Sequence, residues 1–387
     1  MYTNKLLVIL TLSVLFLGVS PYPQIHFQLG FYLLTLAVGV SLLVIIPPVM
    51  LNKRIALFNH PIINLFLFLN LVGVIGASLT GNGITRVIKE AAIFIAPVVF
   101  YFLLINTFPI QREKSQKVFF RVLLITLITL CLFQLVYYPL GFLNFSSRYE
   151  FRHHYVLFSS VFLLLFPLSV INIEKKLTRI SMVLVFSLVI ILTLSRDFQL
   201  YIFLLLVAYF LYRWSKQLSY IYIACFCLFP FMYIGLATYM YQSGSIDKSS
   251  MWRFIELMSF AAHVLKNPAV LLTGDFFGSY LKTIEPIIIF GEAIDEIPRF
   301  HNFWLYLLFK FGLICTLTVY ISAIVYIYKL IRKSQLGYYT GFLLAYMLFV
   351  NGSFWGSFTQ IPAVAILFAF ILYISKKVTK DERSLYN

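Results

Sequence analysis

The sequence predicts an all-α, polytopic integral membrane protein with about twelve transmembrane helices and one large, partly helical loop late in the chain. Of its 387 residues, 61% are hydrophobic and only 11% are charged. A soluble domain normally carries about 25% charged residues. Runs of about 20 apolar residues also recur from end to end, which is the length of a membrane-crossing helix. Because these runs use up most of the chain, residues 1–387 are expected to form a single transmembrane domain.

The expected spans are apolar on all sides and rich in Leu, Ile, Val and Phe. Backbone polar groups in lipid must be satisfied within their own segment, so these spans are expected to be helices. The first apolar run follows Lys5 and resembles a signal peptide, but residues 20–23 fit a cleavage site poorly, so we expect it to be retained. The spans cover residues 5–20, 28–50, 61–79, 88–107, 118–138, 154–172, 180–195, 198–213, 218–239, 302–328, 337–354 and 361–375.

The distribution of charge predicts the orientation of the chain. The net charge is +16, but the basic residues lie in short clusters between apolar runs, which argues against nucleic acid as a partner. If the N-terminus is cytoplasmic, every inner loop is basic, as the positive-inside rule requires. Both termini are then expected in the cytoplasm. The four cysteines all fall inside apolar runs, so neither a disulfide framework nor a zinc site is predicted.

Residues 240–301 differ in composition from the rest of the chain and form the large loop, which the orientation places outside the cytoplasm. The segment is rich in charged residues and contains an amphipathic stretch, residues 250–265, that predicts a helix. Loops of this length are uncommon unless they are functional. We therefore expect the site of action at this loop.

Several basic residues lie on the outer side, against the orientation rule. They include Arg86, Lys89, Arg148, Arg152 and Arg196, together with others in the large loop. Binding of an anionic ligand is the natural explanation for positive charge in these places.

His301 and Asn302 lie where the large loop meets the tenth span. The pKa of histidine is ordinarily close to neutrality, so His301 is a candidate base that removes a proton from an attacking hydroxyl. Asn302 is expected either to cap the following helix or to orient the imidazole. The alternative is a histidine that belongs to an aromatic belt at the membrane surface.

Two arginines are candidate anion ligands. Arg196 follows Ser195 at the outer end of the seventh span, and its planar guanidinium suits phosphate oxygens. The alternatives for Arg196 are contact with lipid headgroups or pairing with Asp197. Arg253 lies in the predicted loop helix, three residues before Glu256, with which it can pair.

Residues 148–154 combine basic, aromatic and histidine side chains ahead of the sixth span. The neighbouring His153 and His154 side chains diverge on a helix or strand, so a surface for sugar or pyrophosphate is preferred to a metal site. No Walker A, GxGxxG or HExxH motif occurs in the sequence, and no DxD motif suggests a metal-held nucleotide sugar. No acidic residue falls in the middle of a span, as an ion-coupled transporter would usually require.

Three segments, in this order and spacing, resemble the O-antigen ligase and O-antigen polymerase superfamily of bacterial inner-membrane proteins. The seventh span ends in Leu194-Ser195-Arg196, and the loop helix carries Arg253 ahead of an Asn-Pro pair and a glycine-containing turn. The loop closes with His301-Asn302 and a leucine-rich run that reaches Gly312. The chain departs from the family pattern at Asp197, where a small residue is usual, and in residues 273–278, where the family turn is richer in glycine.

The resemblance implies a GT-C-like architecture and an inverting glycosyltransferase that needs neither metal nor cofactor. Its substrate would be an undecaprenyl-pyrophosphate-linked oligosaccharide at the periplasmic face, with membrane lipids around it. His301 would be the base, and Arg253 and Arg196 would bind the pyrophosphate. The remaining candidate substrate-binding residues are Arg299, Arg148, Arg152, Asn302 and Arg86.

Within the superfamily the short chain and its Phe-, Tyr- and Ile-rich composition favour a polymerase that joins lipid-linked repeat units. A chain-length regulator protein is then a candidate partner. The first alternative is a ligase that transfers the glycan to lipid A–core. A lipid-linked oligosaccharide flippase is the second alternative, although its charges would be expected along a central cavity between repeated halves.

Overall fold

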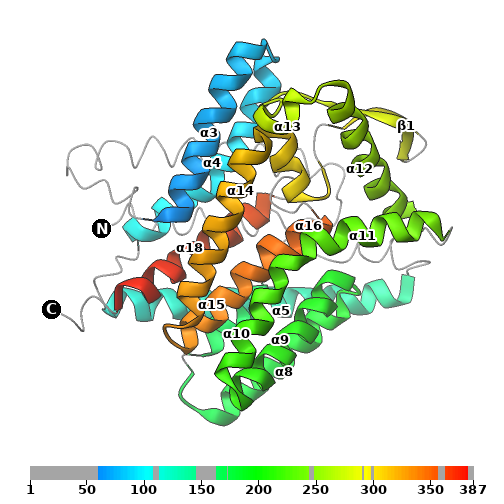
Figure 1. The fold of residues 1–387 in the computed structure, drawn as a ribbon. Helices are drawn as coiled ribbons and strands as arrows, with labels where there is room; N and C mark the ends of the chain where they lie inside the picture. Colours follow the sequence, from blue (N-terminus) through cyan, green and yellow to red (C-terminus); the bar gives the residue numbers. More distant parts are fainter. Residues whose placement is uncertain are drawn as a thin grey trace.

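The computed structural model describes residues 60–107, 113–144, 163–171, 173–243, 248–289, 292–297, 300–355 and 362–381. The first two predicted spans and most of the sixth lie outside these residues. The described part is mostly helical, and its strands form a two-stranded sheet beside the upper helices (Figure 1).

The described elements fall into three stretches of the chain. The first contains α3 (Pro61–Thr80), α4 (Ile84–Thr107), α5 (Glu113–Asn144), α7 (Phe166–Val170), α8 (Lys176–Leu192), α9 (Arg196–Trp214), α10 (Lys216–Ala224), η3 (Cys225–Leu228) and α11 (Phe229–Gln242). The large loop contains α12 (Lys248–Lys266), α13 (Ala269–Thr273), β1 (Leu281–Ile289) and β2 (Glu292–Ile297). The third contains α14 (Phe303–Ile331), α15 (Gln335–Ala345), the π-helical η4 (Tyr346–Asn351), α16 (Gly352–Trp355) and α18 (Pro362–Asp381).

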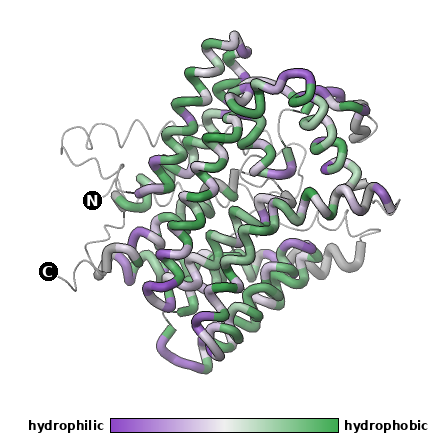
Figure 2. The backbone as a smooth tube through the Cα atoms, in the orientation of Figure 1, coloured by the Kyte–Doolittle hydropathy of each residue, from purple (hydrophilic) through white to green (hydrophobic). Residues whose placement is uncertain are grey.

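Four helices in the described part are long and apolar enough to cross a membrane. They cover Pro61–Thr80, Arg196–Trp214, Lys216–Leu236 and Phe303–Ile331. Hydrophobic residues run along these helices, while hydrophilic ones gather at turns and in the large loop (Figure 2). The eleventh predicted span is divided between α15, η4 and α16. These helices indicate a multi-pass membrane protein, whereas the number twelve stays a prediction.

The large loop is only partly helical. Its predicted helix over 250–265 is confirmed as α12, Lys248–Lys266. The all-α prediction is wrong for β1 and β2, which pair antiparallel with Leu281 opposite Ile297. Both strands are rich in isoleucine, whose branched side chain favours the extended conformation. A short connection between two such segments produces a β-hairpin.

The helix α14 is kinked at Gly312, where φ is 72° and ψ is 178°. The kink leaves the carbonyl groups of Phe309 and Lys310 free for the loop. The backbone N–H of Asp275 donates to the carbonyl oxygen of Phe309 at 2.8 Å, and that of Phe276 donates to Lys310 at 2.9 Å. The loop is therefore joined to α14 by backbone hydrogen bonds at the kink.

Gly312→Ala is expected to destabilise the protein by at least ~1–3 kcal/mol, because the left-handed backbone disfavours any side chain. A Cβ atom at position 312 would also lie 2.1 Å from the carbonyl oxygen of Leu272. The measurement is the thermal unfolding midpoint of the detergent-solubilised protein. Gly235→Ala in α11 is the matched control, since a Cβ there meets nothing within 4 Å. Equal midpoints for the two variants would contradict this account of the kink.

Two aromatic side chains after the α13 turn pack against α3. A Cβ on Gly76 would lie 2.2 Å from the Phe276 ring, and one on Gly73 would lie 2.5 Å from the Phe277 ring. Asn82, two residues after the end of α3, donates to the carbonyl oxygens of Asp275 and Phe277 at 3.3 and 2.8 Å. The small residues of α3 thus provide the surface on which the loop rests.

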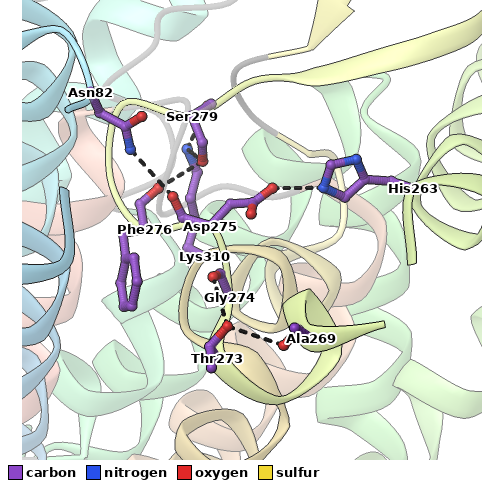
Figure 3. Close-up of polar contacts among 9 residues, drawn as sticks. All are labelled: Asn82, His263, Ala269, Thr273, Gly274, Asp275, Phe276, Ser279 and Lys310. Atoms are coloured by element: carbon purple, nitrogen blue, oxygen red, sulfur yellow. Dashed lines mark hydrogen bonds and ion pairs between the residues drawn. The ribbon is translucent and has the colours of Figure 1, made fainter. Parts of the chain in front are cut away.

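A buried ion pair fastens the same turn to the helices. The ammonium of Lys310 lies 2.9 Å from Glu90 Oε1, and neither residue is more than 4% exposed. Lys310 also donates to the carbonyl oxygen of Ser279 at 2.8 Å (Figure 3). Glu90 Oε2 accepts the backbone N–H of Gly278 at 3.0 Å. Residues 274–280, here called the loop foot, are therefore held by α3, α4 and α14 together.

Candidate functional site

His301 lies two residues before α14 and contacts a buried carboxylate of α12. Its Nδ1 atom is 2.5 Å from Glu256 Oε1, and its backbone N–H donates to Glu256 Oε2 at 2.9 Å. The Glu256 side chain is 2% exposed, whereas that of His301 is 23% exposed. The carboxylate therefore holds both the main chain and the ring of His301, and the ring still reaches solvent.

This contact determines what the imidazole can do. An ionised carboxylate only accepts hydrogen bonds, so Nδ1 carries the proton that it donates to Glu256. The neutral ring then has its lone pair on Nε2. A buried carboxylate also stabilises the positive charge that appears when Nε2 takes up a proton. The pair is suited to general-base chemistry.

Asn302 has one of the two roles that the sequence predicted. Its side-chain oxygen accepts the backbone N–H of Leu305 at 3.0 Å, so it caps the first turn of α14. Orientation of the imidazole is provided by Glu256. The cap fixes where α14 begins and therefore fixes the position of the residue before it, His301.

The helix α12 presents further side chains to this site. Trp252 is one turn before Glu256, and its ring centroid lies 5.4 Å from that of His301. Arg253 is partly buried on the same helix, and both Arg253 and Glu256 act electrostatically on Tyr233 of α11. The structure thus brings His301, Arg253 and Asn302 into one region. The carboxylate of Glu256 forms its hydrogen bonds with His301.

An apolar groove adjoins the site. It has a volume of about 170 Å³ and is lined by side chains of α11, α12 and α14, together with the cap residue Asn302. Tyr233, Leu257 and Trp304 are among its lining residues. Because Asn302 directly follows His301, the groove offers an apolar ligand a place beside the His301–Glu256 pair.

Arg196 is the first residue of α9 and is exposed. The following Asp197 is buried and accepts a hydrogen bond from the Ser195 hydroxyl. Hydrogen bonds through η4 join this helix end to the first turn of α14. Tyr346 of η4 donates to the carbonyl oxygen of Asp197 at 2.6 Å, and Trp304 Nε1 donates to that of Leu348 at 2.9 Å.

The structure describes one of the four remaining predicted site residues. Arg86 of α4 is exposed and stacks over the Tyr280 ring at 3.8 Å, which places it at the loop foot. Arg148, Arg152 and Arg299 lie outside the described residues. Arg86 is therefore a neighbour of the loop in this structure, and its role toward a substrate stays a prediction.

A second imidazole–carboxylate pair joins α12 to the loop foot. His263 Nε2 lies 2.7 Å from Asp275 Oδ2 (Figure 3). His263 follows Glu256 by seven residues, so the two lie on the same side of the helix, about two turns apart. The sequence reasoning missed both pairs. The seven-residue spacing of Glu256 and His263 is visible in the sequence. Their partners are not, because His301 is distant along the chain and Asp275 belongs to a turn.

Among the described residues, no group of three or more His, Cys, Asp or Glu side chains is arranged to hold a metal ion. No protein-family model matches the chain, and a search of curated proteins found no match.

Proposed function

We propose that this chain is a glycosyltransferase of the bacterial inner membrane that polymerises undecaprenyl-pyrophosphate-linked repeat units, as an O-antigen polymerase does. The observation that carries the proposal is the His301–Glu256 pair, a buried carboxylate on a partly exposed imidazole. It lies where a polar loop meets an apolar groove. The resemblance in the three sequence segments supplies the reaction class.

The proposed reaction begins at the acceptor sugar. Nε2 of His301 takes the proton of an acceptor hydroxyl as its oxygen attacks the anomeric carbon of the donor glycan. The bond from that carbon to the pyrophosphate oxygen breaks, and its electron pair leaves with undecaprenyl pyrophosphate. Attack from the opposite face inverts the configuration at the carbon. Glu256 stabilises the imidazolium formed in this step.

Positive charge for the leaving pyrophosphate is proposed to come from arginine side chains. Arg253 lies one turn from Glu256, and Arg196 lies at the start of a helix that is linked to α14 through η4. Their guanidinium groups match phosphate oxygens in geometry and neutralise the charge that develops on the leaving group. In this proposal the arginines take the place of a metal ion.

The apolar groove supports a lipid-linked substrate. A polyprenyl pyrophosphate has an anionic head and a long apolar tail, so it needs polar groups and an apolar surface side by side. The groove lined by Tyr233, Leu257 and Trp304 lies next to the cap of α14 and provides that surface. The full proposal places both termini in the cytoplasm, twelve spans in the membrane and the loop in the periplasm.

The test is the lipopolysaccharide banding of a deletion strain. Core carrying a single repeat unit supports the polymerase. Bare core with accumulating lipid-linked polymer indicates the ligase, and bare core without periplasmic glycan indicates the flippase. The flippase is the weaker alternative, because the polar side chains described above gather in one loop, at helix ends and in the Glu90–Lys310 pair that holds the loop foot.

His301→Ala, expressed in the deletion strain, is expected to form at least about a hundredfold less polymer than the wild-type protein, because the acceptor hydroxyl loses its base. His263→Ala is the matched control, since it removes an equivalent imidazole–carboxylate pair from the same helix. A full ladder from the His301 variant would refute the catalytic role. Equal loss in both variants would mean that the pairs only fasten α12.

A further inference from the structure

Trp252 is a second side chain of α12 that meets His301. The two ring centroids are 5.4 Å apart and the ring planes are inclined by 55°. Trp252 and Glu256 are four residues apart and lie on one side of the helix. The same face of α12 thus brings an aromatic ring and a carboxylate to one imidazole.

Glu256 and Trp252 differ in how deeply they are buried beside His301. Glu256 is buried and occupies Nδ1 of His301. Trp252 is only partly buried, and its inner side packs against the hydrophobic core. The two rings are tilted relative to one another, and both side chains remain partly exposed.

A general base must lie about 2.6–3.2 Å from the hydroxyl oxygen that it deprotonates. The sugar ring that carries this hydroxyl therefore lies directly beside the imidazole. Trp252, at 5.4 Å between centroids, is near enough to contact that same sugar. A hexopyranose has a face of C–H groups, and the electron-rich face of an indole attracts such groups.

We propose that Trp252 is the binding platform for the acceptor, with one neutral hexopyranose residue of the incoming glycan stacked on its indole. The inference deepens the proposed function and rests on it. It assigns the acceptor to the Trp252 side of His301, while the arginines serve the pyrophosphate of the donor. Trp252 binds substrate in this scheme and transfers no proton.

The experiment uses purified full-length protein in proteoliposomes containing lipid-linked repeat unit extracted from the deletion strain. The varied acceptor is the same repeat-unit oligosaccharide, released from its lipid and labelled at the reducing end. Trp252→Leu is expected to raise the KM for this acceptor roughly tenfold with a smaller change in kcat. Trp252→Phe keeps an aromatic face and is expected to stay close to the wild type. Trp214→Leu is the control, because Trp214 is 83% exposed at the far end of α9.

The outcomes separate the two proposals. If the wild type transfers glycan and Trp252→Leu has an unchanged acceptor KM, the platform is refuted and the proposed function stands. If the Leu and Phe variants lose activity to the same extent, Trp252 only packs α12 and the platform is again refuted. A wild-type protein that transfers nothing to the acceptor would overturn both the platform and the proposed function.

Discussion

Glu256→Gln is expected to lower the rate of glycosyl transfer by about two to four orders of magnitude while the protein stays folded. Glutamine has nearly the same shape and can still accept the backbone N–H of His301. Its amide donates to Nδ1, however, so the proton of the neutral ring moves to Nε2. The ring then presents a donor to the acceptor hydroxyl, where the proposed reaction needs a base.

The rate is measured as polymer formed from lipid-linked repeat unit in proteoliposomes, normalised to the amount of folded protein. Asp275→Asn is the matched control, because it makes the same change in the His263 pair on the same helix. That variant is expected to lose no more than a few-fold in rate. If Glu256→Gln were as active as the wild type, the carboxylate would have no part in orienting the base.

Lys310→Met is expected to destabilise the protein by roughly 3–5 kcal/mol, the usual cost of leaving one partner of a buried ion pair alone. The variant leaves the carboxylate of Glu90 without its cation and the carbonyl oxygen of Ser279 without its donor. The carbonyl group belongs to the loop foot, and the carboxylate of Glu90 on α4 holds the foot through the backbone N–H of Gly278. The loop foot is therefore expected to loosen from α4 and α14. The helix α12 is expected to loosen too, because His263 joins it to Asp275 in the foot.

The thermal unfolding midpoint of the detergent-solubilised protein checks this prediction. Lys329→Met provides the control, since Lys329 is exposed in the last turn of the same helix. The double variant Glu90→Gln with Lys310→Met is expected to recover most of the loss, because no buried charge is left alone. A double variant as unstable as Lys310→Met would show that the ion pair is not the source of the effect.

Local patterns predicted a useful part of the site. The amphipathic stretch in residues 250–265 is helical, as expected. Asn302 caps α14, and His301 lies at the junction where the sequence placed it. These features depend on neighbours within one or two helical turns, so their sequence signals are complete in themselves.

The contacts that make the site depend on residues far apart in the chain. Glu256 and His301 are 45 residues apart, and Glu90 and Lys310 are 220 residues apart. The sequence suggested Arg253 as the neighbour of Glu256, because only the helical spacing was visible. The kink at Gly312 is likewise explained by a contact between distant segments, because the backbone of Leu272 in the loop lies against it.

The sequence by itself determined that the chain is a helical membrane protein with a polar loop late in its length, because apolar runs and charge clusters are properties of continuous segments. The tertiary structure decided that the loop contains a β-hairpin, that its foot is fastened at the α14 kink, and that Glu256 holds His301. Such pairings are selected by packing across distant segments, and periodicity within one segment does not encode them.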